Sequence, residues 1–188
     1  MIKEDYMYHK KNEVIYILSG KAESGKNVVA DIIEKYYGKN NCIKISYAYY
    51  IKDYLTRMGK YNDKEKQKYR SLLQEFGVDF LATKVYSNLL INRVLEDIEV
   101  FSYFYKIIII TDARLINEIE VPKQKFENTI TIRIQKEDKN NLTYSEKQHV
   151  TETGLDSYDN FDYIINNNSD LLNLEIKVLD ILKEKNYE

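Results

Sequence analysis

The most constraining feature of this sequence is a short glycine-rich segment, Gly20 to Asn27, between two regular hydrophobic patterns. The residues before it, Val14–Leu18, form a β-branched and aromatic run that is typical of a buried strand. After it, Val29 to Tyr37 carries apolar side chains at i, i+3, i+4, i+7 and i+8, which is one face of a helix. A strand, a glycine turn and a helix in this order predict a loop whose backbone amides converge on phosphate at the helix N-terminus.

The segment has the form G-x-x-x-x-G-K, followed by Asn27 where Ser or Thr is usual. We expect Lys26 to contact the β- and γ-phosphates of ATP. An amide oxygen coordinates Mg²⁺ directly or through water, so Asn27 predicts altered rather than abolished metal binding. The sequence has no N-K-x-D motif for reading guanine, which disfavours a GTPase. The residues expected to bind ATP are Gly20, Lys21, Ala22, Glu23, Ser24, Gly25, Lys26, Asn27 and Val28.

The rest of the chain alternates strand-like and helix-like patterns. The isoleucine run in Lys106–Thr111 is typical of a central parallel strand that is buried on both faces. Further strands are expected at Cys42–Ser46, Thr129–Ile134 and Asp162–Ile165. Helices are expected from Ala48 to Met58, from Asp63 to a stop at Gly77, from about Phe80 to Asp97, from Ala113 to Glu120, and after Ser169 or Asp170 with Leu171 facing inward. This order predicts an α/β fold with a central parallel sheet of about five strands.

Composition narrows the class of protein further. The 188 residues suit a single domain, 1–188, and the net charge of −2 argues against a protein that binds nucleic acid or an anionic membrane. The chain has one cysteine, no apolar run long enough to span a membrane and no signal-like N-terminus. We therefore expect a cytoplasmic protein without a disulfide or a zinc module.

Arginine is scarce, with five Arg against 23 Lys. The bias towards residues of AT-rich codons indicates the genome, that of a bacterium or a phage in our interpretation, rather than a function. Because a planar guanidinium suits phosphate better than an ammonium does, the few arginines become functional candidates. Arg114 follows the isoleucine strand, Arg133 lies on the face of its strand away from the isoleucines, and Arg70 shares a helix face with Gln74.

Asp112 ends the isoleucine strand, at the edge of the sheet where parallel α/β proteins bind ligands. A carboxylate in this position holds Mg²⁺ through water in P-loop enzymes, so Asp112 and Asn27 are the expected metal ligands. The alternative is that Asp112 caps the helix that follows it, and both roles are compatible. His149 has no matching set of ligands, so no zinc site is expected.

Several motifs together resemble those of phage-type deoxynucleoside monophosphate kinases, to which animal-type phosphomevalonate kinases are similar. The glycine-rich loop followed by Val29-Ala30-Asp31 resembles the opening of that family. The resemblance continues in order along the chain, through Ser46-Tyr47-Ala48 with Lys52, Arg70-x-x-Leu73-Gln74-x-x-Gly77, Thr111-Asp112-Ala113-Arg114 with Asn117-Glu118, Arg133, His149-x-Thr151-Glu152 and Ile165-Asn166-Asn167. Two departures are the absence of Arg from Asp79–Ala82 and the acidic Glu23 in the loop.

The resemblance implies a P-loop NTPase fold with acceptor-binding helices at about 46–97 and a lid at about 135–157. It implies transfer of the γ-phosphoryl of ATP to a (deoxy)nucleoside monophosphate, with Mg²⁺. The catalytic residues would be Lys26, Asp112, Arg114 and Arg133. The substrate-binding residues would be Ser46, Lys52, Arg70, Gln74, Arg114, Glu118, His149 and Glu152.

Two alternatives remain open from the sequence. The first is a kinase of the same shape for another small phosphate, such as phosphomevalonate. The second is a nucleotide-binding module with little catalysis, which the unusual Asn27 and Glu23 make worth testing. A nucleotide substrate is the expected partner, and the sequence leaves a homodimer open.

Overall fold

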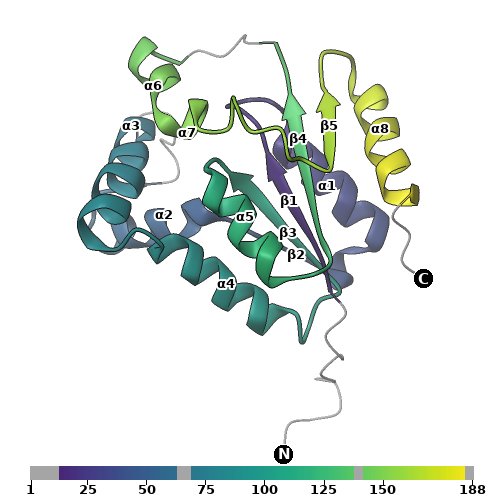
Figure 1. The fold of residues 1–188 in the computed structure, drawn as a ribbon, viewed down its shortest axis with the longest axis horizontal. Helices are drawn as coiled ribbons and strands as arrows, with labels where there is room; N and C mark the ends of the chain where they lie inside the picture. Colours follow the sequence, from purple (N-terminus) through teal and green to yellow (C-terminus); the bar gives the residue numbers. More distant parts are fainter. Residues whose placement is uncertain (1–12, 63–68, 138–141, 185–188) are drawn as a thin grey trace, which may run out of the picture.

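A computed structural model describes residues 13–62, 69–137 and 142–184. Five parallel strands form one sheet in the order β2-β3-β1-β4-β5 (Figure 1). The predicted α/β fold with a central parallel sheet is therefore confirmed. The strands are β1 Val14–Ser19, β2 Cys42–Ile45, β3 Ile107–Ala113, β4 Thr129–Gln135 and β5 Tyr163–Asn166.

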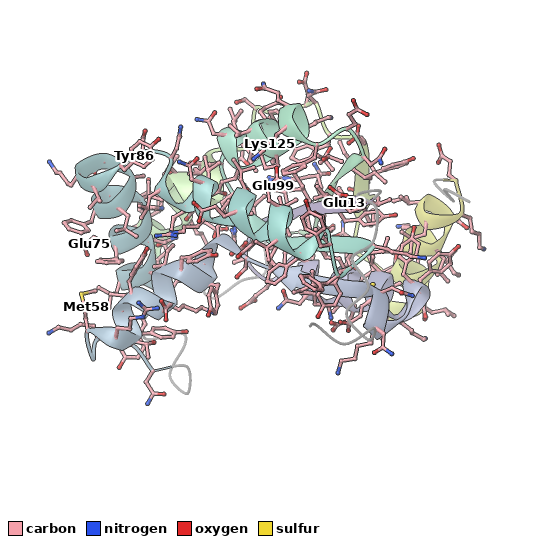
Figure 2. The ribbon with its side chains drawn as sticks, turned by 90° about the horizontal axis from the view of Figure 1, so that it is seen from below. Glu13, Met58, Glu75, Tyr86, Glu99 and Lys125 are labelled. Carbon is pink, nitrogen blue, oxygen red and sulfur yellow. The ribbon has the colours of Figure 1, made fainter. Side chains whose placement is uncertain are left out.

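Helices cover both faces of the sheet. One face packs against α1 (Lys26–Tyr37) and α8 (Leu171–Glu184), and the other against α2 (Tyr47–Arg57), α4 (Leu89–Phe101) and α5 (Ile116–Lys125). Ile107 to Ile110 alternate between the two cores and are almost fully buried, as the unbroken run predicts. Each such side chain contributes roughly 1.5–3 kcal/mol of burial energy. An ion pair of 3.2 Å between Glu99 and Lys125 joins α4 to α5 at the surface (Figure 2).

The helical arm beside the sheet, which we define as residues 70–85, differs from the sequence prediction. Gly77 does not end a helix, because α3 (Arg70–Gln74) continues directly into a π-helical segment, η3 (Glu75–Val85). A Cβ on Gly77 would lie 2.5 Å from Ile51 Cδ1, so this glycine permits close packing of the arm on α2. The helix expected from Phe80 to Asp97 is helical over most of its length but is interrupted, since the chain leaves η3 after Val85 and α4 begins at Leu89. The predicted cap Asp63 lies outside the described residues.

The helix after β3 also begins later than predicted. Ala113 still belongs to β3, and α5 runs through Pro122. A proline inside a helix leaves the carbonyl four residues earlier without its usual amide donor. That carbonyl, of Glu118, instead accepts a hydrogen bond of 2.7 Å from the Tyr47 hydroxyl, which ties α5 to α2. At the C-terminal helix, Asp170 accepts a hydrogen bond from the Asn173 amide as a cap, whereas Leu171 is exposed rather than inward.

The predicted lid contains two short helices, α6 (Tyr144–Gln148) and α7 (Val150–Thr153). They lie over the end of the sheet next to α3 (Figure 1). None of the described helices is long and apolar enough to cross a membrane.

Candidate active site

The glycine-rich loop joins β1 to the N-terminus of α1, as predicted. Gly25 has a φ of +104°, and a Cβ there would lie 2.5 Å from Asn167 Nδ2. A Cβ on Gly20 would lie 2.4 Å from the Ile134 carbonyl oxygen. Close approach of the backbone therefore favours glycine at position 20, and the left-handed backbone conformation favours it at position 25. Asn167 was not among the predicted site residues, yet it supports the loop by donating a hydrogen bond of 2.8 Å to the Ser24 carbonyl.

The N-terminus of α1 is suited to an anion. It has no side-chain cap and no acidic residue in its first turn, so its first amides are left for a ligand. Lys26 is 8% exposed and donates to the carbonyl oxygens of Gly20 and Lys21, at 2.7 and 2.8 Å. Burial, and secondarily the positive charge of Arg114, lower the pKa of Lys26 from 10.5 to about 7. A bound phosphate would replace these carbonyls as the partner of the ammonium and raise that pKa again.

A cavity of about 870 Å³ opens from this loop towards the helical arm. It brings together most of the predicted site residues from distant parts of the chain. The wall that the arm contributes is apolar. Several of its residues, such as Val78 and Ala82, were not predicted as site residues from the sequence. Gln74, Val78 and Ala82 follow one another at intervals of four, a spacing that predicts one shared helix face. The predicted residues that line the cavity are Ala22, Glu23, Ser24, Gly25, Lys26, Asn27, Val28, Ser46, Lys52, Arg70, Gln74, Asp112, Arg114, Glu118 and Glu152.

Asp112 lies at the sheet edge of this cavity. Its two carboxylate oxygens accept hydrogen bonds of 2.9 Å from the Tyr47 and Ala48 amides. It is therefore a helix cap, but of α2 rather than of the helix that follows it. Ser46 caps the same helix through its hydroxyl, which accepts from the Tyr49 amide. Burial raises the pKa of Asp112, although these hydrogen bonds oppose the change.

The expected metal ligands line the same cavity. Asn27 and Asp112 both offer oxygen atoms, the donor type that Mg²⁺ prefers. The described residues contain no group of three or more His, Cys, Asp and Glu side chains able to hold a metal. One or two protein oxygens suffice for Mg²⁺ that also binds substrate phosphates and water, so these residues fit that ion rather than a fully protein-held metal.

Arg70 and Arg114 meet at one carboxylate. Glu152 Oε1 accepts from Arg70 Nη2 at 2.5 Å and from Arg114 Nη1 at 2.7 Å, and Oε2 accepts from the Ala22 amide at 2.9 Å. Next to it, Thr151 accepts a hydrogen bond of 3.0 Å from Gln74 Nε2. The predicted lid is therefore joined to the loop and to the arm in this structure.

Glu118 supports the backbone next to Arg114. Its carboxylate accepts hydrogen bonds from the backbone amides of Arg114 at 2.6 Å and Leu115 at 3.0 Å. Burial is the main cause that raises the pKa of Glu118 from 4.5 to about 7. Glu118 therefore fixes the backbone that carries the Arg114 guanidinium.

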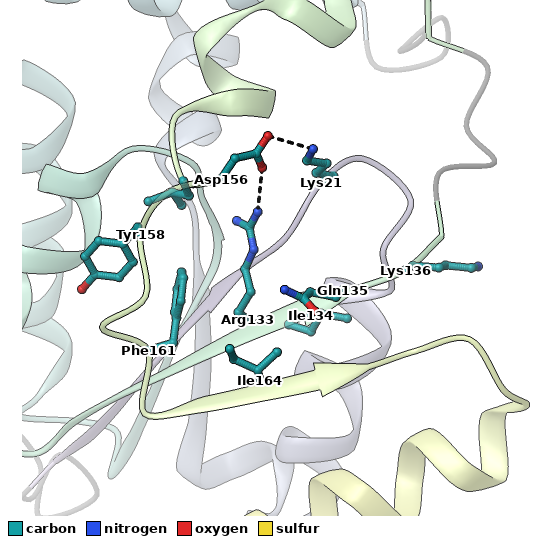
Figure 3. Close-up of a pocket in the computed structure, with 10 residues that line it drawn as sticks. Lys21, Arg133, Ile134, Gln135, Lys136, Asp156, Tyr158, Phe161 and Ile164 are labelled. Atoms are coloured by element: carbon teal, nitrogen blue, oxygen red, sulfur yellow. Dashed lines mark hydrogen bonds and ion pairs between the residues drawn. The ribbon is translucent and has the colours of Figure 1, made fainter.

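Arg133 does not line the cavity that Arg70 and Arg114 line, although it lies close enough to Arg114 for their charges to interact. It is 8% exposed and lines a separate pocket of about 270 Å³ (Figure 3). Its guanidinium donates to Ser19 Oγ at 3.0 Å and lies 5.7 Å from the Phe161 ring centroid. Asp156, from the predicted lid, lies between Arg133 and Lys21 and pairs with both, at 3.5 and 3.0 Å. Sequence reasoning missed Asp156.

His149 also lies outside the walls of the large cavity. Its Nδ1 accepts from the Thr151 amide at 3.2 Å and so begins α7. Its Nε2 lies 3.6 Å from Asp79 Oδ2 on the arm. Its position therefore links the lid to the arm rather than presenting a group to the cavity.

The sheet order, the phosphate-binding loop and the adjoining cavity define a P-loop kinase. Solved structures with the same fold include shikimate kinase from Acinetobacter baumannii (14% identity, 95% of this chain and 97% of that chain, TM-score 0.54) and from Bacteroides thetaiotaomicron (14%, 91% and 97%, 0.53). A third is TT1252 from Thermus thermophilus (12%, 94% and 100%, 0.56). No curated protein matches this chain in sequence.

A family model described as deoxynucleotide monophosphate kinase matches residues 58–178, more than half of the chain. The chain belongs to this family and is a nucleotide monophosphate kinase, as its motifs predict. The matched range contains the arm, Asp112, Arg114 and the lid. The glycine-rich loop precedes it, so the loop and the family match are separate indications of the same activity.

Proposed function

We propose that this protein transfers the γ-phosphoryl group of ATP to a deoxynucleoside monophosphate. The observation that carries the proposal is the single cavity that joins the phosphate-binding loop to Arg70, Arg114 and the apolar wall of the arm. The loop and Lys26 would hold the donor phosphates, the arginines the acceptor phosphate, and the apolar wall the acceptor base. The proposed setting is the cytoplasm of a bacterial or phage-infected cell.

The reaction needs little covalent chemistry from the protein. An oxygen of the acceptor phosphate attacks the γ-phosphorus in line, the bond from that phosphorus to the β,γ-bridging oxygen breaks, and ADP leaves with that oxygen. Since the acceptor phosphate is ionised near neutral pH, no general base is required. Mg²⁺ held near Asn27 and Asp112 would supply charge neutralisation at the β- and γ-phosphates.

The residues of the protein would position the substrates and neutralise the charge of their phosphates. Lys26 and the α1 amides would bind the β- and γ-oxygens, and Arg114 would stabilise charge on the transferred group. The lid, which contacts the loop through Glu152, would exclude water and so prevent wasteful hydrolysis of ATP. Arg133 would contribute positive charge from behind the loop, where it donates a hydrogen bond to Ser19 Oγ.

The test is ADP formation from Mg-ATP with deoxy- and ribonucleoside monophosphates and phosphomevalonate as acceptors. We expect stimulation by one or a few deoxynucleotides. Lys26→Ala should lose at least about a hundredfold in turnover, because it removes a cation from the transferred charge. Lys35→Ala, on the same helix but exposed and paired with Glu175, is the matched control and should retain activity. Stimulation by phosphomevalonate alone, or ATP binding without any acceptor-dependent turnover, would refute the proposal.

A further inference from the structure

Among the carboxylates of the lid that the structure describes, Glu152 is the most deeply buried, with 3% of its side chain exposed. It belongs to α7, yet its partners come from three other parts of the chain. They are the Ala22 amide in the loop, Arg70 at the start of α3 and Arg114 after β3. These three parts lie far apart in the sequence. Among the described hydrogen bonds, no other side chain joins all three of them.

Arg70 and Arg114 share one carboxylate, that of Glu152, as a hydrogen-bond partner. Further acidic groups surround them, because Asp112 and Glu118 interact electrostatically with Arg114, and Glu146 with Arg70. Arg70 Nε is buried and has no hydrogen-bond partner among the described residues. A buried charged donor without a partner is costly, so this atom indicates a ligand oxygen that would complete the site.

Resting on the function proposed above, we propose that Glu152 is a positioning residue that assembles the acceptor-phosphate site when the lid closes. It accepts from Arg70 Nη2 and from Arg114 Nη1, which also donates to the Thr151 carbonyl at 3.3 Å, and leaves Arg70 Nε and the other Arg114 nitrogens for the acceptor phosphate. Its second oxygen fixes the same unit to the loop that holds ATP. Glu152 itself does not contact the substrate in this arrangement.

The competing arrangement makes Glu152 a substitute for phosphate that the substrate must displace. The two arrangements predict opposite results for Glu152→Gln, which keeps the shape of the side chain and removes its charge. A positioning residue predicts weaker binding of the acceptor. A displaced substitute predicts tighter binding, because the competing carboxylate is gone.

The experiment measures the dissociation constants of deoxynucleoside monophosphates and of a non-hydrolysable ATP analogue by calorimetry. Asp159→Asn removes an exposed carboxylate just beyond the end of the lid and is the control. We expect Glu152→Gln to weaken acceptor binding by about tenfold and to affect the ATP analogue much less, the size that a lost charged hydrogen bond gives. Asp159→Asn should change neither.

Hydrogen exchange measured on the same variants tests the connection without any substrate. In Glu152→Gln, peptides covering 20–25 and 144–156 should lose protection together, while β3 keeps its protection and shows that the core is folded. Unchanged protection, unchanged acceptor binding, or tighter acceptor binding would each overturn the proposal. If the wild type binds no nucleoside monophosphate, the proposed function fails, and joint loss of protection would still support Glu152 as the tie between lid and loop.

Discussion

The lowered pKa of Lys26 predicts that nucleotide binding depends on pH in a particular direction. With a pKa of about 7 in the free protein, Lys26 is mostly charged at pH 6 and mostly neutral at pH 8. If only the charged form binds the phosphates, the charged fraction falls from about nine tenths to about one tenth over this range. The dissociation constant of ATP should therefore rise by about tenfold between pH 6 and pH 8.

Proton uptake provides the direct assay. Because bound phosphate raises the pKa of the ammonium, binding at pH 8 should take up close to one proton per ATP. Calorimetry in buffers with different ionisation enthalpies measures this number. Lys26→Arg is the control, since a guanidinium stays charged across the range and any remaining pH dependence belongs to ATP itself. No proton uptake at pH 8, or identical pH profiles for wild type and Lys26→Arg, would refute the reasoning.

Two further predictions concern stability. Asp112→Ala removes the cap from two amides of α2, so the free energy of unfolding in urea should fall by about 1–2 kcal/mol; a change below about 0.5 kcal/mol would contradict the capping role. Glu118 has a folded-state pKa of about 7, above its ordinary 4.5, so its contribution to stability is complete below pH 4.5 and is lost as the pH rises to 7. The melting temperature of the wild type should therefore fall more between pH 5 and pH 7 than that of Glu118→Gln, and equal slopes would show that the carboxylate titrates normally.

The fold and the glycine-rich loop between β1 and α1 were predictable because their signals are local. The isoleucine run of β3, the alternation in β4 and the amphipathic face of α1 each report burial within a few residues. The loop is a consecutive segment, so its glycines and lysine are recognised together in the sequence. The errors came where tertiary packing replaces a local rule. Gly77 predicted a helix end, but the structure uses it as a contact with Ile51.

The sequence by itself determined the succession of strands and helices along the chain, the loop between β1 and α1, and the residue types that we propose bind phosphate. Tertiary structure alone decided how those residues meet. Arg70 and Arg114 converge on Glu152, whereas Arg133, chosen by the same argument from scarcity, lies in another pocket. The conformation of a loop depends on residues that are neighbours in the sequence. Contacts between distant segments depend on how the arm and the lid pack, and a short sequence pattern does not contain that information.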